Sequence, residues 1–129
     1  MKVDWPHPLI TKSIQPGWAR VVCAWSVWIE RLGGTCVTVE AGFEFDWDSV
    51  PRIPGVHALL KGRAEKSACL HDWLYRYQPC SRKTADLIFL DAMVEEGVAW
   101  RHRQLIYWGV RSGGSLAWRG RATSKEALS

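Results

Sequence analysis

A histidine, a tyrosine and two aspartates stand close together in the sequence and could form a catalytic centre. His71, Asp72 and Tyr75 belong to one predicted helix, and Asp86 belongs to the next. His71 and Tyr75 are one helical turn apart and share a face, whereas Asp72 lies about 100° round from His71. Because Asp86 falls on the apolar flank of its helix, where an unpaired carboxylate is costly, we expect it to face His71.

These side chains fit general base catalysis by a histidine. A carboxylate on a neighbouring helix fixes the imidazole tautomer, so that His71 can take a proton from water or from a hydroxyl group. Asp72 is turned away from the ring and would bind a hard divalent cation together with oxygens from the loop around Asp46 and Asp48. The candidate residues of this metal-assisted hydrolase site are His71, Asp86 and Tyr75 for catalysis and Asp72, Asp46 and Asp48 for the metal.

The helices that must position these groups are marked by caps and breakers. A helix over residues 64–77 is ended by Pro79, and Ser81 is a suitable N-cap for a second helix that closes near Gly97. A third helix, over residues 100–110, ends at Gly113 and Gly114.

The residues before the helices predict strands. Residues 20–29 and 35–45 alternate in hydrophobicity on either side of Gly33 and Gly34, which is typical of a β-hairpin with one buried face. Residues 1–19 contain three prolines and no sustained period, so we expect an irregular lead-in. The fold class is therefore α+β: an N-terminal β-hairpin or small antiparallel sheet followed by three packed helices.

The connecting and terminal segments complete the expected organisation. Residues 45–55 are predicted to form a structured loop because Pro51, Pro54 and Gly55 interrupt regular structure, and residues 56–60 to form a short helical turn. Residues 115–129 are small and charged and are predicted to be an extended basic tail. A chain of 129 residues is one ordinary domain, here spanning residues 20–114.

Composition limits the classes of function. Nine tryptophans are many for this length and suit an interface or a sugar or lipid surface. The net charge of +4 comes largely from arginines after residue 100, which could contact phosphate or anionic lipid, but no nucleic-acid fold signature accompanies them, so no nucleic-acid partner is expected. The four cysteines have no metal-site spacing, the N-terminus does not resemble a signal peptide, and no apolar run could span a bilayer. We expect reduced thiols and synthesis in the cytoplasm.

Several separated blocks resemble an uncharacterised family of tailed-phage and prophage proteins, domain-of-unknown-function family 1353. The blocks are Gly42-Phe43 to Pro51-Arg52, His71 to Arg76, Ser81 to Asp86 with Phe89 and Met93, and Tyr107 with Val110-Arg111 and Gly113. They agree in order and spacing over about residues 20–118. This resemblance implies a phage origin and no particular activity.

A shorter stretch, residues 68–76 with Asp86, is similar to the catalytic helices of secretory phospholipases of the A-two class. In those enzymes a His-Asp-x-x-Tyr helix supplies the water-activating base and a calcium ligand, and an aspartate on the next helix orients the histidine. The resemblance implies His71 as base, Asp72 as calcium ligand and Asp86 as orienting group, bonded to Tyr75. The glycine-rich calcium loop of those enzymes is absent, and Cys69 is displaced from the position of their anchoring cysteine.

Two other interpretations stay open. The His-Asp pair could be a satisfied buried polar contact that fixes helix packing, with Arg52, Arg76 or Arg82 bridging the carboxylates without a metal. A histidine-aspartate phosphohydrolase, using His57 as well, would need a larger all-helical bundle. The sequence therefore predicts either a virion or assembly component, a tail, neck or baseplate protein that docks on other phage proteins, or a small phage hydrolase acting on lipid or cell-envelope material.

Overall fold

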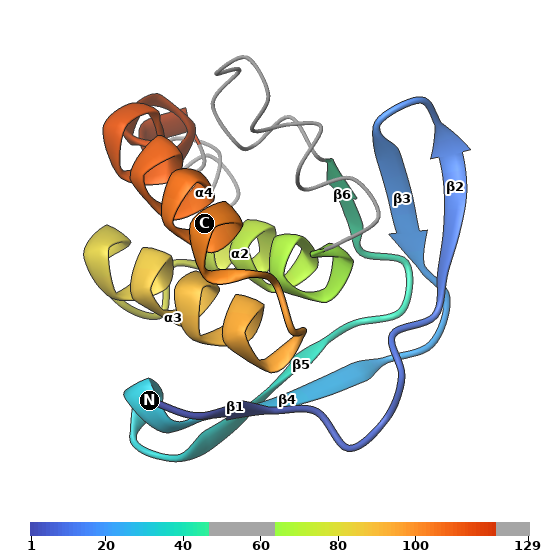
Figure 1. The fold of residues 1–129 in the computed structure, drawn as a ribbon. Coiled ribbons are helices and arrows are strands. Elements are labelled where there is room, and N and C mark those ends of the chain that lie inside the picture. Colours follow the sequence, from blue (N-terminus) through green and yellow to red (C-terminus); the bar gives the residue numbers. More distant parts are fainter. Residues whose placement is uncertain (47–63, 121–129) are drawn as a thin grey trace.

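The computed structural model describes residues 1–46 and 64–120, and within them six strands precede the helices. The strands are β1 (Val3–Asp4), β2 (Thr11–Gln15), β3 (Trp18–Val21), β4 (Trp25–Ile29), β5 (Thr35–Val39) and β6 (Glu44–Asp46). The helices α2 (Glu65–Tyr77), α3 (Arg82–Glu95) and α4 (Trp100–Gly113) follow and pack on one another (Figure 1). The predicted α+β class is confirmed.

The strands form two antiparallel sheets, in the orders β1-β4-β5 and β2-β3-β6. The predicted hairpin is present, because β4 pairs with β5 from Trp25 opposite Val39 to Ile29 opposite Thr35. Its strands are shorter than expected, however, because residues 22–24 and 40–43 do not pair with each other. Beyond this interruption the two segments pair again, as β3 with β6. Gly42 has a φ of 93°, and its N–H bonds to the carbonyl of Val21 at 2.7 Å, so a turn divides the hairpin into two sheets.

The expectation of an irregular lead-in over residues 1–19 is wrong. The segment supplies edge strands to both sheets, since β1 pairs with β4 through Val3 and Ile29 and β2 pairs with β3. Pro6, Pro8 and Pro16 lie in the links between these strands, where a missing N–H does not interrupt a ladder. The strands are short and mostly polar, so alternation did not reveal them.

The helices begin and end close to the predicted positions. The Ser81 hydroxyl accepts a hydrogen bond from the Thr84 N–H at 3.2 Å, which confirms the N-cap of α3. The start of α2 is capped by a distant group, because Glu96 accepts hydrogen bonds from the N–H groups of Lys66 and Ser67. Residues 115–120 are helical rather than extended, and the segments 47–63 and 121–129, with the predicted loop, its helical turn and the end of the tail, lie outside the described residues.

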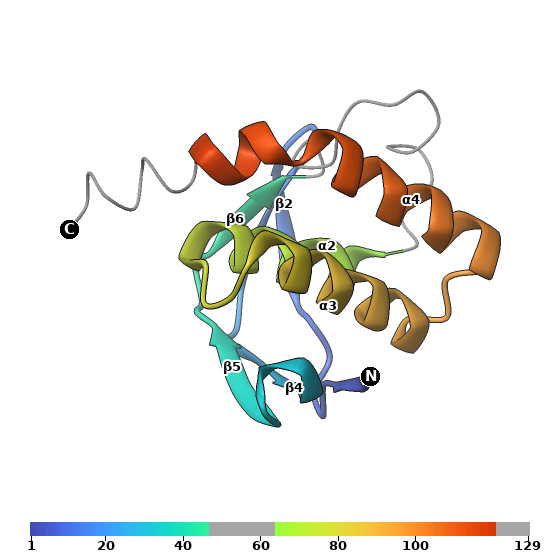
Figure 2. The ribbon, with the colours of Figure 1, turned by 90° about the vertical axis from the view of Figure 1, so that its left-hand side faces the viewer.

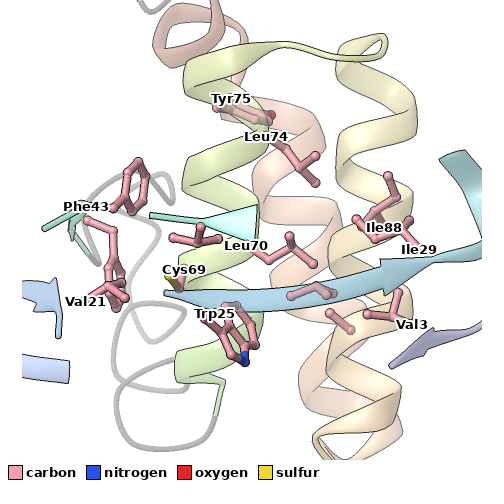
Figure 3. Close-up of a cluster of buried hydrophobic side chains, with 14 of the residues drawn as sticks. Val3, Val21, Trp25, Ile29, Phe43, Cys69, Leu70, Leu74, Tyr75 and Ile88 are labelled. Atoms are coloured by element: carbon pink, nitrogen blue, oxygen red, sulfur yellow. The ribbon is translucent and has the colours of Figure 1, made fainter. Parts of the chain in front are cut away.

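The core lies between the sheets and the helices. Figure 3 shows Val3 and Ile29 of the first sheet near Ile88 of α3, and Leu70 and Leu74 of α2 belong to the same cluster. All of these side chains are at most 1 % exposed. A second cluster joins α3 to α4 through apolar side chains, Phe89, Met93, Ile106 and Val110. Together the two clusters fix α2, α3 and α4 relative to one another, and the candidate site lies where these helices meet.

Candidate active site

The carboxylate of Asp86, on α3, is the centre of a buried polar cluster. Its Oδ1 accepts hydrogen bonds from Nε2 of His71 and from the hydroxyl of Tyr75, each at 2.7 Å. Its Oδ2 accepts one from Nη1 of Arg111 at 2.8 Å and a longer one from Nη1 of Arg82 at 3.5 Å. Every lone pair of the carboxylate therefore faces a donor, and the predicted contact between His71 and Asp86 is present.

Side chains from three helices, α2, α3 and α4, form this cluster. The spacing of α2 places His71 and Tyr75 on the face toward α3, with their ring centroids 4.3 Å apart. Phe89, one turn after Asp86 on α3, stacks on the imidazole at 4.3 Å, and α4 brings Arg111 from the opposite side. The side chains of His71, Tyr75 and Asp86 are at most 1 % exposed, so their polar contacts are made within the protein.

The surroundings of Asp86 keep it charged. Burial raises the pKa of this carboxyl, but hydrogen bonds from His71, Tyr75 and Arg111 outweigh it and leave the pKa below its ordinary value. An ionised carboxylate can only accept, so Nε2 of His71 carries the proton that it donates. The pKa of Tyr75 is raised, first by burial and then by the Asp86 charge, so its phenol stays protonated and donates as well.

The second nitrogen of the imidazole, Nδ1, is not used in the contact with Asp86. Because the proton sits on Nε2, Nδ1 of His71 holds a lone pair. In the part of the chain that the structure describes, this buried nitrogen has no hydrogen-bond partner. Buried polar atoms are nearly always paired, with protein or with water, and an acceptor nitrogen oriented from behind by a carboxylate is the arrangement of a general base.

Of the three predicted metal ligands, only the side chain of Asp72 lies in the described residues. Asp72 is fully buried on α2, and after burial its charge is the strongest cause of the raised pKa of the Cys69 thiol. Asp48 and the side chain of Asp46 lie outside the described residues. Among the side chains that can be placed, no three carboxylate, imidazole or thiolate groups gather as metal ligands. One carboxylate does not make a calcium site, because calcium takes six to eight oxygen ligands.

The arginines of the cluster were only partly anticipated. Of the three proposed to bridge the carboxylates, Arg82 contacts Asp86, Arg76 instead lies over the ring of Phe43 at 5.0 Å, and Arg52 is outside the described residues. Arg111 makes the shorter ion pair, at 2.8 Å, although it was not predicted to belong to the site. The signal available was its position in the last turn of α4, four residues after buried Tyr107, which places the two residues on nearly the same side of the helix.

Two further residues enclose Tyr75 and were not anticipated. The ring of Trp118 meets it edge to face with centroids 5.1 Å apart. Gly114 leaves no room for a side chain, because an added Cβ would lie 2.7 Å from the Tyr75 hydroxyl and 2.5 Å from the carbonyl oxygen of Val110. The end of α4 and the following residues therefore cover the phenol that bonds Asp86.

The fold and the site define an α+β protein whose packed helices hold a buried histidine-aspartate pair. A family model described as "Protein of unknown function (DUF1353)" matches residues 21–110, and the chain belongs to this family. No curated protein and no solved structure matches it. The matched residues include His71, Tyr75, Asp86 and Arg82 and end one residue before Arg111. No helix in the described residues is long and apolar enough to cross a bilayer.

Proposed function

We propose that this protein is a hydrolase that cleaves an ester bond, with His71 as the general base. The observation that carries the proposal is the difference between the two imidazole nitrogens. Nε2 is bonded to the charged Asp86, and Nδ1 has a lone pair with no partner in the described residues. A histidine that served only to join α2 to α3 would gain from pairing both nitrogens, since an unmet buried acceptor costs about 1–3 kcal/mol.

The proposed reaction follows from these roles of the two nitrogens. Nδ1 takes a proton from a water molecule while the water oxygen forms a bond to the ester carbonyl carbon. When the tetrahedral intermediate collapses, the bond between carbon and the leaving oxygen breaks, and that oxygen takes the proton back from Nδ1. Asp86 stays ionised throughout and stabilises the imidazolium, while Tyr75 and Arg111 hold the carboxylate in place.

The test measures turnover by the purified protein on a nitrophenyl ester and on phospholipid in mixed micelles. Both are measured with calcium present and with a chelator, because the ligands around Asp72 are only partly described. We expect hydrolysis of one ester class, and His71→Gln lowers the rate by roughly 100-fold or more. His7→Gln, which changes an exposed histidine, serves as the control. Equal rates for His71→Gln and the unchanged protein, or no turnover of either ester by the unchanged protein, contradict the proposal.

A second candidate function is that of a virion or assembly component. It is favoured by the exposed apolar surface of α4, where Trp100 and Trp108 are 64 % and 61 % exposed. In that role another phage protein covers this surface, the chain ends up in the particle, and the polar cluster only fixes the packing of the helices. Introducing His71→Gln into the phage genome separates the two: normal particles without the hydrolytic or lytic phenotype favour catalysis, and failed assembly without measurable turnover favours the structural role.

A further inference from the structure

The outward face of α4 carries large apolar side chains that the core does not use. Trp100, Leu105 and Trp108 are each more than half exposed, and with Arg101 and Gln104 they line one shallow groove. We call these five residues the α4 outer face. Figure 2 shows α4 along the edge of the molecule, on the far side of α2 and α3 from β4 and β5.

This exposure is not a failure of packing. The opposite side of α4 packs in the core, where Ile106 and Val110 are buried against α3. At 100° per residue Trp108 points almost directly away from that side, flanked by Leu105 and Arg101. Grouped aromatic and aliphatic side chains on an exposed face mark a surface that another body covers.

The charge around this face is of one sign. From Gly97 to Gly120 the chain contains four arginines and no aspartate or glutamate. Two of them, Arg101 and Arg103, lie in the first turn of α4, which has neither an acidic residue nor a side-chain cap. Arg103 donates a hydrogen bond to the carbonyl of Val98 at 3.0 Å, whereas Arg101 lines the groove. The charge of Arg101 opposes the helix dipole there, so it does not serve the stability of the helix. It is complementary to an anionic partner.

We infer that the α4 outer face docks on the surface of an anionic lipid bilayer. A helix that lies in the plane of such a surface places its tryptophans and Leu105 at the boundary of the acyl chains and Arg101 among the phosphates. A nucleic-acid partner would match the arginines but would leave Leu105 and the apolar groove unused. The surface goes beyond the proposed hydrolase, because docking requires no turnover.

The position of α4 gives this docking a consequence for the polar cluster. The same helix that presents Trp108 outward directs Arg111 inward to Asp86 at 2.8 Å. Arg82 of α3 also donates to the carbonyls of Val110 and Arg111, at 3.2 and 3.4 Å, so the end of α4 is held directly on the site. A bilayer bound at the outer face would therefore lie one helix away from His71.

The experiment measures co-sedimentation of the full chain with vesicles of phosphatidylcholine alone and of phosphatidylcholine mixed with phosphatidylglycerol. We expect binding to the anionic vesicles that weakens as salt is added. Trp108→Ala lowers the affinity roughly tenfold, by loss of buried apolar area. Arg101→Gln lowers it about fivefold, by loss of one charge near the phosphates.

Matched controls keep the result specific to this face. Val94→Ser removes an exposed apolar side chain of α3, and Lys12→Gln removes an exposed charge of β2, so both should bind as the unchanged protein does. His71→Gln should also bind normally, which separates docking from hydrolysis. The inference fails if binding ignores the anionic lipid or if Trp108→Ala and Val94→Ser bind alike. It fails as well if the unchanged protein binds no vesicles. If, in that case, the α4 variants lose binding to a phage protein or to nucleic acid, that partner covers the α4 outer face instead of a bilayer.

Discussion

Nε2 of His71 and Oδ1 of Asp86 lie 2.7 Å apart at the contact between α2 and α3, and neither side chain reaches solvent. The contact joins elements that are neighbours in the sequence, but its strength depends on a third element, since Arg111 of α4 holds the other carboxylate oxygen. The cluster is therefore both a fold contact and a candidate catalytic centre, and substitutions can separate the two roles.

Replacing Asp86 by asparagine tests the orienting role of the charge. The amide has nearly the shape of the carboxylate but cannot accept from both His71 and Arg111 as an anion does. We expect the hydrolytic rate to fall by roughly 100-fold or more, because the imidazole loses its fixed tautomer. Thermal unfolding of the same sample measures the cost to the fold. A variant that keeps the full rate would show that Asp86 does not orient the base.

Tyr75→Phe removes one hydroxyl donor from Asp86 and leaves the ring in the core. The carboxylate keeps its bonds to His71 and Arg111, so we expect a loss of about 1 kcal/mol in the free energy of unfolding and a modest fall in rate. Denaturant unfolding measures the first and ester turnover the second. Tyr77→Phe, which removes a hydroxyl bonded to Glu40 at the surface, is the matched control and should leave the rate unchanged.

The pair on α2 and α3 could be predicted because its signals are local. The four-residue spacing puts His71 and Tyr75 on one face, Ser81 marks the start of the next helix, and an aspartate on an apolar flank needs a partner. None of these signals depends on how distant segments meet. The helices and the contact between His71 and Asp86 followed from them.

Other features depended on tertiary placement and could not be predicted in the same way. Arg111 reaches Asp86 only because α4 packs on α3, and an arginine in the last turn of a helix has an equally ordinary role at the surface. The bend of the hairpin depends on a turn at Gly42 inside an alternating run. The strands of the first nineteen residues are held by pairing with β4 and β3, which local propensity does not report.

Arg111→Met should destabilise the protein strongly. The substitution keeps much of the apolar stem but leaves the buried Asp86 charge with Arg82 at 3.5 Å as its only remaining guanidinium contact among the described residues. Breaking a largely buried ion pair from one side costs about 3–5 kcal/mol, and partial exposure of Arg111 places the expected loss at the lower end. Chemical denaturation measures it. Arg101→Met, at an exposed position of the same helix, should change stability by less than about 0.5 kcal/mol.

The stability of the protein should fall in acid through Asp86. Its pKa in the folded protein is below its ordinary value of 3.8, so the charged form favours the folded state. This contribution is complete above pH 3.8 and is lost as the pH falls through the folded value. The difference in melting temperature between the unchanged protein and Asp86→Asn should therefore persist from neutral pH down to about pH 3.8 and shrink at lower pH. A constant difference down to strongly acid pH would show that another interaction causes it.

Gly114→Ala should disturb the cluster from outside. Its Cβ would lie 2.5 Å from the carbonyl oxygen of Val110 and 2.7 Å from the hydroxyl of Tyr75, and backbone on one side and a bonded phenol on the other leave it no space. Relief requires the end of α4 to move away from α2, which lengthens the contact of Tyr75 with Asp86. We expect a loss of about 1–3 kcal/mol in stability together with a lower hydrolytic rate.

Gly120→Ala gives the matched comparison for that substitution. Gly120 lies in the helical segment after Gly114, and nothing lies within 4 Å of an added Cβ, so alanine there should be neutral or stabilise by up to about 1 kcal/mol. Denaturant unfolding of both variants, with ester turnover alongside, measures the difference. If Gly114→Ala unfolds at the same denaturant concentration as Gly120→Ala, the end of α4 is not packed against Tyr75 as described. If it loses stability but keeps its rate, the phenol contributes to packing and not to the orientation of Asp86.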